Sequence, residues 1–438
     1  MHDDLVRLGH VVLLILVLFL SSCGGGNGAG SAQSSPPTAV DRDSDGDGII
    51  DSLDEFPQVD AYGMVRVSPS TAGITIEKVN GFMDAVFDGD RATQGVMIVY
   101  KGMVIGERYA PGKNSQDRVT SWSVAKSLYA SAIGIAIDEG WIQSLDDRVS
   151  DYITDWQGSD KEAMTIRHML SMRSGLTPMV DDNSVGGEGI FFSEDQTAFA
   201  LARPLVYQPG SNYQYVNSTS QLMESVIKKA TGLDAHDYLV QKLLKPIDIE
   251  TEDIGLWVDA TGINPLTYCC IDMQIEDFAR FGLLTLKEGR WRTEQVLSSS
   301  FVRESGRPWP DDEESFYGLK WWLYNDALFG LSSTANSKAR ELTGTSELSI
   351  RVAIGYQQQY IYVLPSHDLV IARFSLNNHN SNQGYIVNTS DNPNFPDTCT
   401  GRNACSSSEG EPVAAMNMGS FLQAMGPLLQ CINSPDAC

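Results

Sequence analysis

The sequence predicts an α+β fold in which one antiparallel sheet is built from both ends of the chain's body, with a mainly helical region inserted between them. Strand-like segments occur near residues 95–109 and again near 359–374, and helical patterns occupy the stretch between. The chain has 438 residues, and roughly 370 remain after an N-terminal leader and tether, which is enough for one large domain.

The strands are predicted as two hairpins. Residues 95–100 and 103–109 are rich in β-branched and apolar side chains, and a Lys-Gly pair between them is typical of a tight turn. Residues 359–364 and 369–374 have the same character and flank a Pro-Ser-His-Asp turn. Because the pairs lie at opposite ends of the body, we expect them to meet in one sheet.

Four segments in the middle of the chain have helical apolar spacing and end close to a glycine, which is a frequent helix stop. They are residues 123–139, 165–172, 218–230 and 272–288. Residues 377–412 are instead rich in Asn, Ser, Gly and Pro, and we expect an irregular insertion there.

Composition excludes one class of partner. The formal net charge is −25, and 42% of the residues are hydrophobic, as in globular proteins. Binding to a polyphosphate backbone requires a basic face, so the sequence argues against a nucleic-acid partner.

The N-terminus resembles an export signal. Residues 11–20 are apolar, too few to span a bilayer but enough for the core of a signal peptide. Residues 20–23, Leu-Ser-Ser-Cys, resemble a bacterial lipobox, so residues 1–22 are predicted to be a lipoprotein signal peptide and Cys23 the lipidated residue. Residues 23–40 read as a flexible tether. We therefore expect an exported, membrane-anchored lipoprotein of the periplasm or outer membrane; the alternative is an ordinary signal peptide with an incidental cysteine.

An Asp-rich segment, residues 41–57, has the spacing of a calcium loop. Its carboxylates fall at loop positions 1, 3, 5, 9 and 12, which are Asp43, Asp45, Asp47, Asp51 and Asp54. Gly48 allows the sharp turn at position 6, although the last position is Asp rather than the usual Glu. The segment resembles a thrombospondin type 3 repeat and predicts a structural calcium ion; the alternative is a solvated acidic linker.

Apart from Cys23 the chain has six cysteines, an even number that favours disulfides in an exported protein. The sequence does not choose among the pairings. As local pairs we favour Cys399 with Cys405 and Cys431 with Cys438.

Ser123 and Lys126 are the strongest candidates for catalysis. Ser123 comes at the start of a predicted helix, where the helix dipole favours negative charge on its oxygen, and Lys126 lies one turn later on the same face. A lysine can act as a base only when its pKa lies well below the free value of about 10.4. Burial has that effect, and the neighbours of Lys126 are apolar. A second Ser-x-x-Lys, Ser225 to Lys228, falls in mid-helix and lacks this context.

Tyr215 and Asn217 form the second candidate element. They are the only Tyr-x-Asn in the chain and follow a Pro-Gly turn. A phenol beside a lysine ammonium loses its proton more readily and can relay it. The chain has no Gly-x-Ser-x-Gly elbow. Its six histidines do not form a convincing Ser-His-Asp set, although such a triad is defined by geometry rather than by sequence.

These elements, in this order, resemble the serine β-lactamase and penicillin-binding-protein superfamily. The likeness extends from about Gly95 to Phe374 and includes residues 165–176 and the segment Tyr-Gly-Leu-Lys-Trp-Trp at 317–322. Within the class C-like branch, the motif around Ser123 is most similar to 6-aminohexanoate-dimer (nylon oligomer) hydrolases and family VIII esterases. The resemblance implies a β-lactamase-like hydrolase domain over residues 65–430.

The resemblance also implies roles. Ser123 would be the nucleophile, Lys126 its base, Tyr215 a proton relay and Asn217 an orienting group. The family's third motif, on a strand at the sheet edge, falls on residues 353–355, so that the amide of Tyr356, after Gly355, would join that of Ser123 in the oxyanion hole. Catalysis would need no cofactor.

Two departures from the family pattern bear on the substrate. Ala353 replaces the cation that in β-lactamases and DD-peptidases helps to hold the substrate carboxylate, and Gln358 replaces a glycine of the nylon-hydrolase pattern. We therefore expect a small-molecule ester or amide substrate, cleaved through an acyl-enzyme. The alternatives are a penicillin-recognising enzyme of the same fold and a non-catalytic surface binding module.

Overall fold

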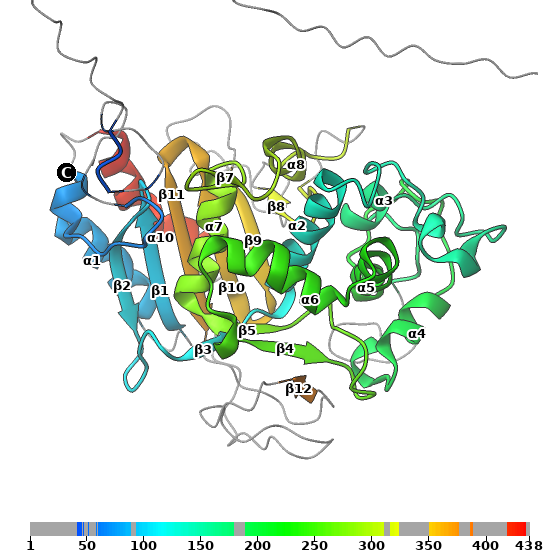
Figure 1. Ribbon diagram of the computed structural model, residues 1–438. Coiled ribbons are helices and arrows are strands. Elements are labelled where there is room, and N and C mark those ends of the chain that lie inside the picture. Colours follow the sequence, from blue (N-terminus) through cyan, green and yellow to red (C-terminus); the bar gives the residue numbers. More distant parts are fainter. Residues whose placement is uncertain are drawn as a thin grey trace, which may run out of the picture. The chain divides into compact units, whose positions relative to one another are not determined.

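The computed structural model in Figure 1 describes residues 42–45, 47, 51, 58, 60–88, 93–178, 189–310, 316–323, 350–375, 386–388 and 418–434. The chain divides into two compact units, Met1–Arg42 and Asp43–Cys438. The predicted signal peptide, Cys23 and the tether lie outside the described residues, as does most of the 377–412 insertion.

A six-stranded antiparallel sheet forms the centre of the second unit, in the order β2-β1-β11-β10-β9-β8. Its strands are β1 (Thr93–Tyr100), β2 (Met103–Tyr109), β8 (Trp322–Leu323), β9 (Arg351–Gly355), β10 (Gln359–Leu364) and β11 (Leu369–Ser375). The pairing of β1 with β11 joins the two predicted hairpins into one sheet. The predicted antiparallel sheet from both ends of the body is therefore confirmed.

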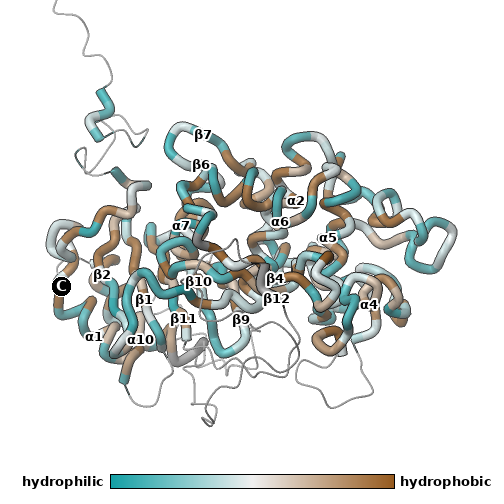
Figure 2. Tube along the Cα trace, turned by 60° about the horizontal axis from the view of Figure 1, so that its bottom comes forward, coloured by the Kyte–Doolittle hydropathy of each residue, from teal (hydrophilic) through white to brown (hydrophobic). Residues whose placement is uncertain are grey.

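Helices cover both faces of this sheet. Along β11, Val370, Ala372 and Phe374 belong to the core shared with α2 (Ala125–Asp138) and α7 (Ile275–Leu286). The alternate residues Leu369 and Ile371 belong to a second core, against α1 (Ile76–Phe87) and α10 (Met418–Asn433). In Figure 2, where brown marks hydrophobic residues, brown stretches occur among the strands of this sheet. This period of two along a strand is what a sheet buried on both faces requires.

The inserted region is mainly helical and lies beside the sheet in Figure 1. Its helices are α3 (Ile166–Leu170), α4 (Gln196–Ala202), α5 (Asn217–Thr231) and α6 (Ala235–Leu239). The predicted glycine stops are present: Gly140 and Gly232 follow α2 and α5 with φ of 77° and 75°, a region that favours glycine.

A second, four-stranded sheet has the order β12-β4-β5-β3, and its strands lie low in the view of Figure 1. Its strands are β3 (Arg118–Thr120), β4 (Gly255–Val258), β5 (Ile271–Gln274) and β12 (Ile386–Asn388). The helix predicted from residue 272 therefore begins later, at Ile275. Residues 271–274 pair with β3 and β4 instead, because long-range pairing overrides local helical preference.

The remaining elements are short. They are the helix α8 (Ser299–Ser305), the strands β6 (Arg290–Trp291) and β7 (Glu294–Gln295), the 3₁₀ turns η1 (Pro69–Ala72), η2 (Trp122–Val124), η3 (Val149–Asp151), η4 (Thr154–Trp156), η5 (Ile190–Phe192), η7 (Lys245–Ile247), η8 (Thr251–Asp253), η10 (Tyr356–Gln358) and η11 (Pro365–His367), and the π-helical turn η6 (Val240–Leu244).

Cys269 and Cys270 are joined by a disulfide between adjacent residues, a pair that the sequence analysis did not propose. Cys431 is also disulfide-bonded. The predicted pairs Cys399–Cys405 and Cys431–Cys438 include cysteines outside the described residues and stay predictions.

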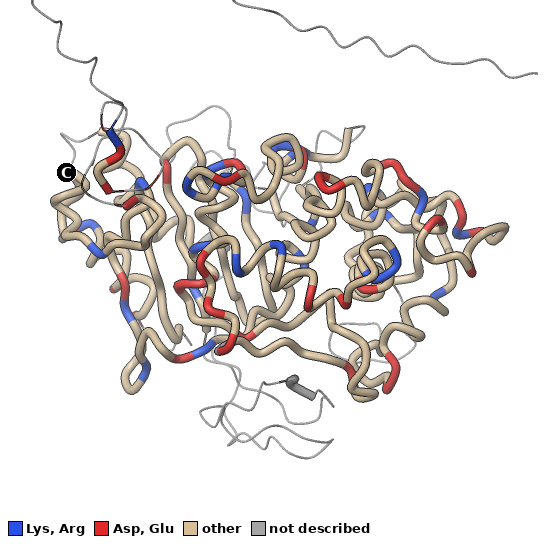
Figure 3. Tube along the Cα trace, in the orientation of Figure 1, with Lys and Arg blue, Asp and Glu red and all other residues tan. Residues whose placement is uncertain are grey.

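Figure 3 shows acidic and basic residues interspersed along the described part of the chain. In the part of the chain that the structure describes, no helix has the length and apolar character needed to cross a membrane.

Candidate active site

Ser123 lies in a tight 3₁₀ turn, η2, that leads directly into α2. The turn is fixed to β5 because the Ser121 amide donates to the carbonyl of Ile271 at 2.8 Å and the Ile271 amide donates to Ser121 Oγ at 2.7 Å. Trp122 has φ of 46°, which is unusual for a bulky residue and is the kind of backbone outlier found at functional sites. The result is a half-buried Ser123 side chain at the entrance of the helix.

Lys126 is the centre of the site. It is the second residue of α2, and only 1% of it is exposed. Its Nζ lies 2.8 Å from Ser123 Oγ, 2.8 Å from Asn217 Oδ1 and 2.7 Å from the carbonyl oxygen of Tyr268. The three partners come from η2, the start of α5 and the segment before β5.

This geometry can support proton transfer from the serine. A carbonyl oxygen can only accept hydrogen bonds. If the amine of Lys126 is neutral, its two N–H bonds are donated to Asn217 Oδ1 and the Tyr268 carbonyl, and its lone pair faces Ser123 Oγ. The two acceptors thus orient Lys126 as a base toward Ser123.

The ring of Tyr215 contacts the amine of Lys126. Its ring centroid lies 5.1 Å from Lys126 Nζ, and its ring stacks on Trp322 at 5.5 Å. Tyr213 and Tyr317 are close by, and burial raises the pKa of each, with a further rise from the neighbouring Tyr215. Those two phenols therefore keep their protons at neutral pH, and Tyr215 is the ring of the three that is seen against Lys126 Nζ.

Asn217 opens α5, with 7% of it exposed, and its amide oxygen points to Lys126. Tyr215 precedes it by two residues in an extended stretch that ends at Val216. The Tyr-x-Asn spacing predicted from sequence thus brings a ring and an amide to the same amine.

The end of β9 lies against the turn that carries Ser123. A Cβ at Gly355 would overlap the carbonyl oxygen of Ser121, so only glycine permits this approach. The ring of Tyr356 meets that of Trp122 at 5.3 Å between centroids. Tyr356 therefore lies beside Trp122, the residue that precedes Ser123.

Ala353 is completely buried and pairs across the sheet with Ile361. The position at which the resemblance implied a missing cation is thus an apolar core position. Gln358 has φ of 65°, in the left-handed region that favours glycine. A glycine at this position would therefore adopt the same backbone without strain.

The Tyr268 carbonyl is the functional group that the sequence did not predict. Any residue supplies a main-chain carbonyl, so no residue pattern marks it. Tyr268 lies between Thr267, whose amide donates to Gln221 Oε1, and β5. Only the folding of this segment against α2 brings the Tyr268 carbonyl to Lys126.

The second Ser-x-x-Lys does not form a site. Ser225 Oγ donates to Glu224 at 2.9 Å, and Lys228 is exposed and 3.9 Å from the same carboxylate. Both residues lie within α5, away from its N-terminus, as the sequence predicted.

The described histidines of the body have other partners. His168 caps α3 by accepting from the Thr165 amide through Nδ1, and burial lowers its pKa. His236 bonds the Tyr129 hydroxyl and the Trp257 carbonyl, and His367 bonds Ser366. These contacts support structural roles rather than a Ser-His-Asp triad.

The predicted calcium ligands are close together where they are described. Carboxylate oxygens of Asp43, Asp45 and Asp47 lie within 4.8 Å of one another, and Asp47 is fully buried. Asp51 accepts from the amide and hydroxyl of Ser44. Asp54 lies outside the described residues. A set of carboxylates of this kind suits calcium, which prefers oxygen ligands.

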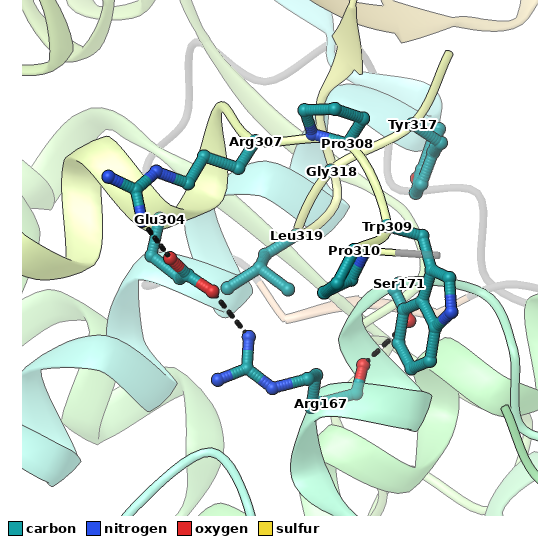
Figure 4. Close-up of a pocket in the computed structure, with 10 residues that line it drawn as sticks. All are labelled: Arg167, Ser171, Glu304, Arg307, Pro308, Trp309, Pro310, Tyr317, Gly318 and Leu319. Carbon is teal, nitrogen blue, oxygen red and sulfur yellow. Dashed lines mark hydrogen bonds and ion pairs between the residues drawn. The ribbon is translucent and has the colours of Figure 1, made fainter. Parts of the chain in front are cut away.

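A separate small cavity lies between α3 and the segment after α8 (Figure 4). Its residues are Arg167, Ser171, Glu304, Arg307, Pro308, Trp309, Pro310, Tyr317, Gly318 and Leu319. Arg167 and Arg307 both pair with Glu304 at its wall. Its volume of about 10 Å³ is close to the limit for one water molecule, so it is not a substrate site.

Comparison with known proteins identifies the family of the chain. A family model described as Beta-lactamase matches residues 77–386, more than half of the 438 residues. A 6-aminohexanoate-dimer hydrolase from Paenarthrobacter ureafaciens is 23% identical over 309 residues, covering 65% of this chain and 73% of that protein.

Two solved structures show the same fold. EstCE1, a hydrolase with promiscuous acyltransferase activity, has a TM-score of 0.52 at 14% identity, covering 68% of this chain and 92% of that one. A penicillin-binding protein homologue from Caulobacter crescentus has a TM-score of 0.52 at 13% identity, covering 68% and 90%. The chain therefore belongs to the beta-lactamase family and has the α+β fold of its serine hydrolases.

Proposed function

We propose that this protein is a serine hydrolase that cleaves a small-molecule carboxylic ester or amide through an acyl-enzyme. The observation that carries the proposal is the position of Lys126, whose Nζ lies 2.8 Å from Ser123 Oγ while two further oxygens accept its other hydrogen bonds. Such a pair supplies both a nucleophile and its base without a cofactor.

In the first half-reaction, Ser123 Oγ attacks the substrate carbonyl and Lys126 accepts the hydroxyl proton. The proton passes through Tyr215, whose ring lies against Lys126, to the leaving alcohol or amine as its bond to the carbonyl carbon breaks. In the second, water attacks the acyl-enzyme by the reverse proton path and releases the acid and free Ser123.

The negative charge that develops on the carbonyl oxygen would be held by two backbone amides, those of Ser123 and Tyr356. The contact between Trp122 and Tyr356 supports this role, because it brings the two segments together. One such donor contributes about 3 kcal/mol to transition-state stabilisation.

Two features bear on the substrate class. Ala353 is apolar and fully buried, so this strand position offers no charge for a substrate carboxylate, and the Tyr215 ring beside Lys126 contacts the rings of Tyr317 and Trp322. These features favour an uncharged, largely apolar acyl or leaving group over penicillin or a D-Ala-D-Ala peptide. A penicillin-recognising enzyme remains the rival of the same fold, and a non-catalytic binding module the rival of another class.

The central prediction concerns Ser123. Ser123→Ala should lower kcat by at least about 1,000-fold on a panel of aryl esters and short amides, because the nucleophile is lost. It should also abolish labelling by a fluorophosphonate probe. Initial rates and gel fluorescence measure the two effects.

Ser225→Ala is the matched control, since it alters the other Ser-x-x-Lys and should leave both signals intact. A wild-type protein that is neither labelled nor active across the panel contradicts the hydrolase proposal and favours the binding module. Labelling by a fluorescent penicillin at low concentration, with little ester turnover, favours the penicillin-recognising rival.

The pH dependence tests Lys126 as the base. Asn217→Asp places a carboxylate where an amide oxygen now accepts from Nζ at 2.8 Å, and a neighbouring negative charge favours the ammonium over the free amine. The acidic limb of the pH–rate profile should therefore move to higher pH, by roughly one unit or more, and the rate at pH 7 should fall.

Asn114→Asp adds the same charge in an exposed loop and serves as the control. An unaltered pH profile in a folded Asn217→Asp enzyme would mean that Lys126 is not the base.

We further propose that the Asp43–Asp47 cluster binds calcium in a structural role, supported by its motif and by carboxylate oxygens within 4.8 Å. Calcium should raise the melting temperature of the full chain, and Asp43→Asn, which changes an exposed ligand, should weaken binding by about tenfold or more. Calorimetry and thermal melts with calcium or a chelator measure this. Equal melts under both conditions, with no binding heat, count against calcium.

Finally, we propose that the protein is exported and anchored to a membrane, in the periplasm or outer membrane, through lipid on Cys23. This proposal rests on the lipobox-like sequence alone. In cell fractionation the wild type should be found with membranes, and Cys23→Ala should move to the soluble fraction. A Cys23→Ala protein that stays with membranes excludes this anchor.

A further inference from the structure

Arg373 is a fully buried cation in β11, a strand of the main sheet. It lies near the end of β11, the strand paired with both β1 and β10, and none of its surface is exposed. A buried guanidinium is tolerated only when its donors are satisfied, so its partners show what it holds in place.

Its fork joins the two neighbouring strands. Nη1 donates to the carbonyl oxygen of Gln358 at 2.7 Å and to that of Gln357 at 3.4 Å. Nε and Nη2 donate to Thr93 Oγ1, at the start of β1, at 3.2 and 2.8 Å. Arg373 thus connects the first residue of β1 with the turn between β9 and β10.

That turn has an unfavourable backbone. Gln357 and Gln358 have φ of 58° and 65°, and two consecutive residues with a Cβ in the left-handed region need support from their surroundings. Tyr356 comes directly before them. Its side chain contacts Trp122 but is 55% exposed, so the position of its backbone depends largely on the turn that follows.

A second set of bonds holds the same turn. Ser375 Oγ donates to the Gln357 carbonyl at 2.7 Å. The side chain of Gln359, which follows the turn, bonds Ser375 twice, through its Nε2 to Oγ at 2.7 Å and its Oε1 to the amide at 2.8 Å. The carbonyls of both left-handed residues are therefore tied to β11.

We propose that Arg373, supported by Ser375, is a positioning residue that fixes the β9–β10 turn and thereby aims the Tyr356 amide at the developing oxyanion. Arg373 does not touch the substrate; it acts through the two carbonyls that it binds. This inference rests on the proposed hydrolase function. It adds a residue that affects kcat without lining the candidate site.

The expected effect is on the chemical step. An oxyanion donor acts mainly in the transition state, so displacing it lowers kcat more than it raises KM. Loss of a whole donor costs about 100- to 1,000-fold in kcat, and a misplaced donor should cost less.

The test uses Arg373→Lys and Ser375→Ala in the full chain. Lysine keeps the charge but lacks the planar fork that reaches several acceptors. We expect Arg373→Lys to lower kcat on the best ester by about 10- to 100-fold with KM within about threefold, and Ser375→Ala to show a smaller loss in the same direction. Amide hydrogen exchange, followed by mass spectrometry, should rise in the peptide that covers residues 355–360.

Arg351→Lys is the matched control. Arg351 is also an arginine of the main sheet whose guanidinium donates to a backbone carbonyl, that of Val302, but it lies at the opposite end of β9 from the turn. Its substitution should lower thermal stability without changing kcat or the exchange of residues 355–360. Thermal melts of every variant separate the loss of folding from the loss of rate.

A folded Arg373→Lys enzyme with kcat within twofold of wild type and unchanged exchange in the turn overturns the inference. If Arg373→Lys does not fold, the same two measurements on Ser375→Ala decide it. If wild-type protein has no turnover, the proposed function fails and so does the catalytic part of this inference, while hydrogen exchange still decides whether Arg373 holds the turn.

Discussion

The buried amine of Lys126 is the interaction on which the candidate site depends. One charged or polar nitrogen inside a protein requires partners, and here they come from three parts of the chain: Ser123, Asn217 and the carbonyl of Tyr268. The need to satisfy Nζ thus fixes the positions of η2, the start of α5 and the segment before β5 relative to one another. When the amine is neutral, the same bonds leave its lone pair directed at Ser123 Oγ.

The sheet makes that convergence possible. Pairing of β1 with β11 brings the first and last strands of the body together, and α2 packs between this sheet and the inserted helices. Ser123 and Lys126 lie at the start of α2, where the end of β9 approaches so closely that residue 355 must be glycine. The proposed nucleophile, its proposed base and the proposed oxyanion strand therefore meet where the main sheet adjoins the inserted helices.

The environment around this centre is apolar and aromatic. Ala353 is buried among hydrophobic residues, and Tyr215 stacks on Trp322. The departures from the family pattern at Ala353 and Gln358 therefore bear on the proposed substrate rather than on the proposed nucleophile and base. Behind the sheet, Arg373 and Ser375 hold a turn whose backbone would not be stable alone, which extends the proposed catalytic apparatus beyond the residues that line it.

The sequence by itself determined the strands at both ends of the body, the helices with glycine stops and the residues Ser123, Lys126, Tyr215 and Asn217, because periodicity and short motifs are local properties. Three features were decided only by tertiary structure. Residues 271–274 became a strand because β3 and β4 offered partners for their backbone. The Tyr268 carbonyl reached Lys126, and Arg373 reached the β9–β10 turn, through docking of segments far apart in the chain. A backbone carbonyl has no sequence signature, so the groups that orient the base and fix the turn become visible only when the chain is folded.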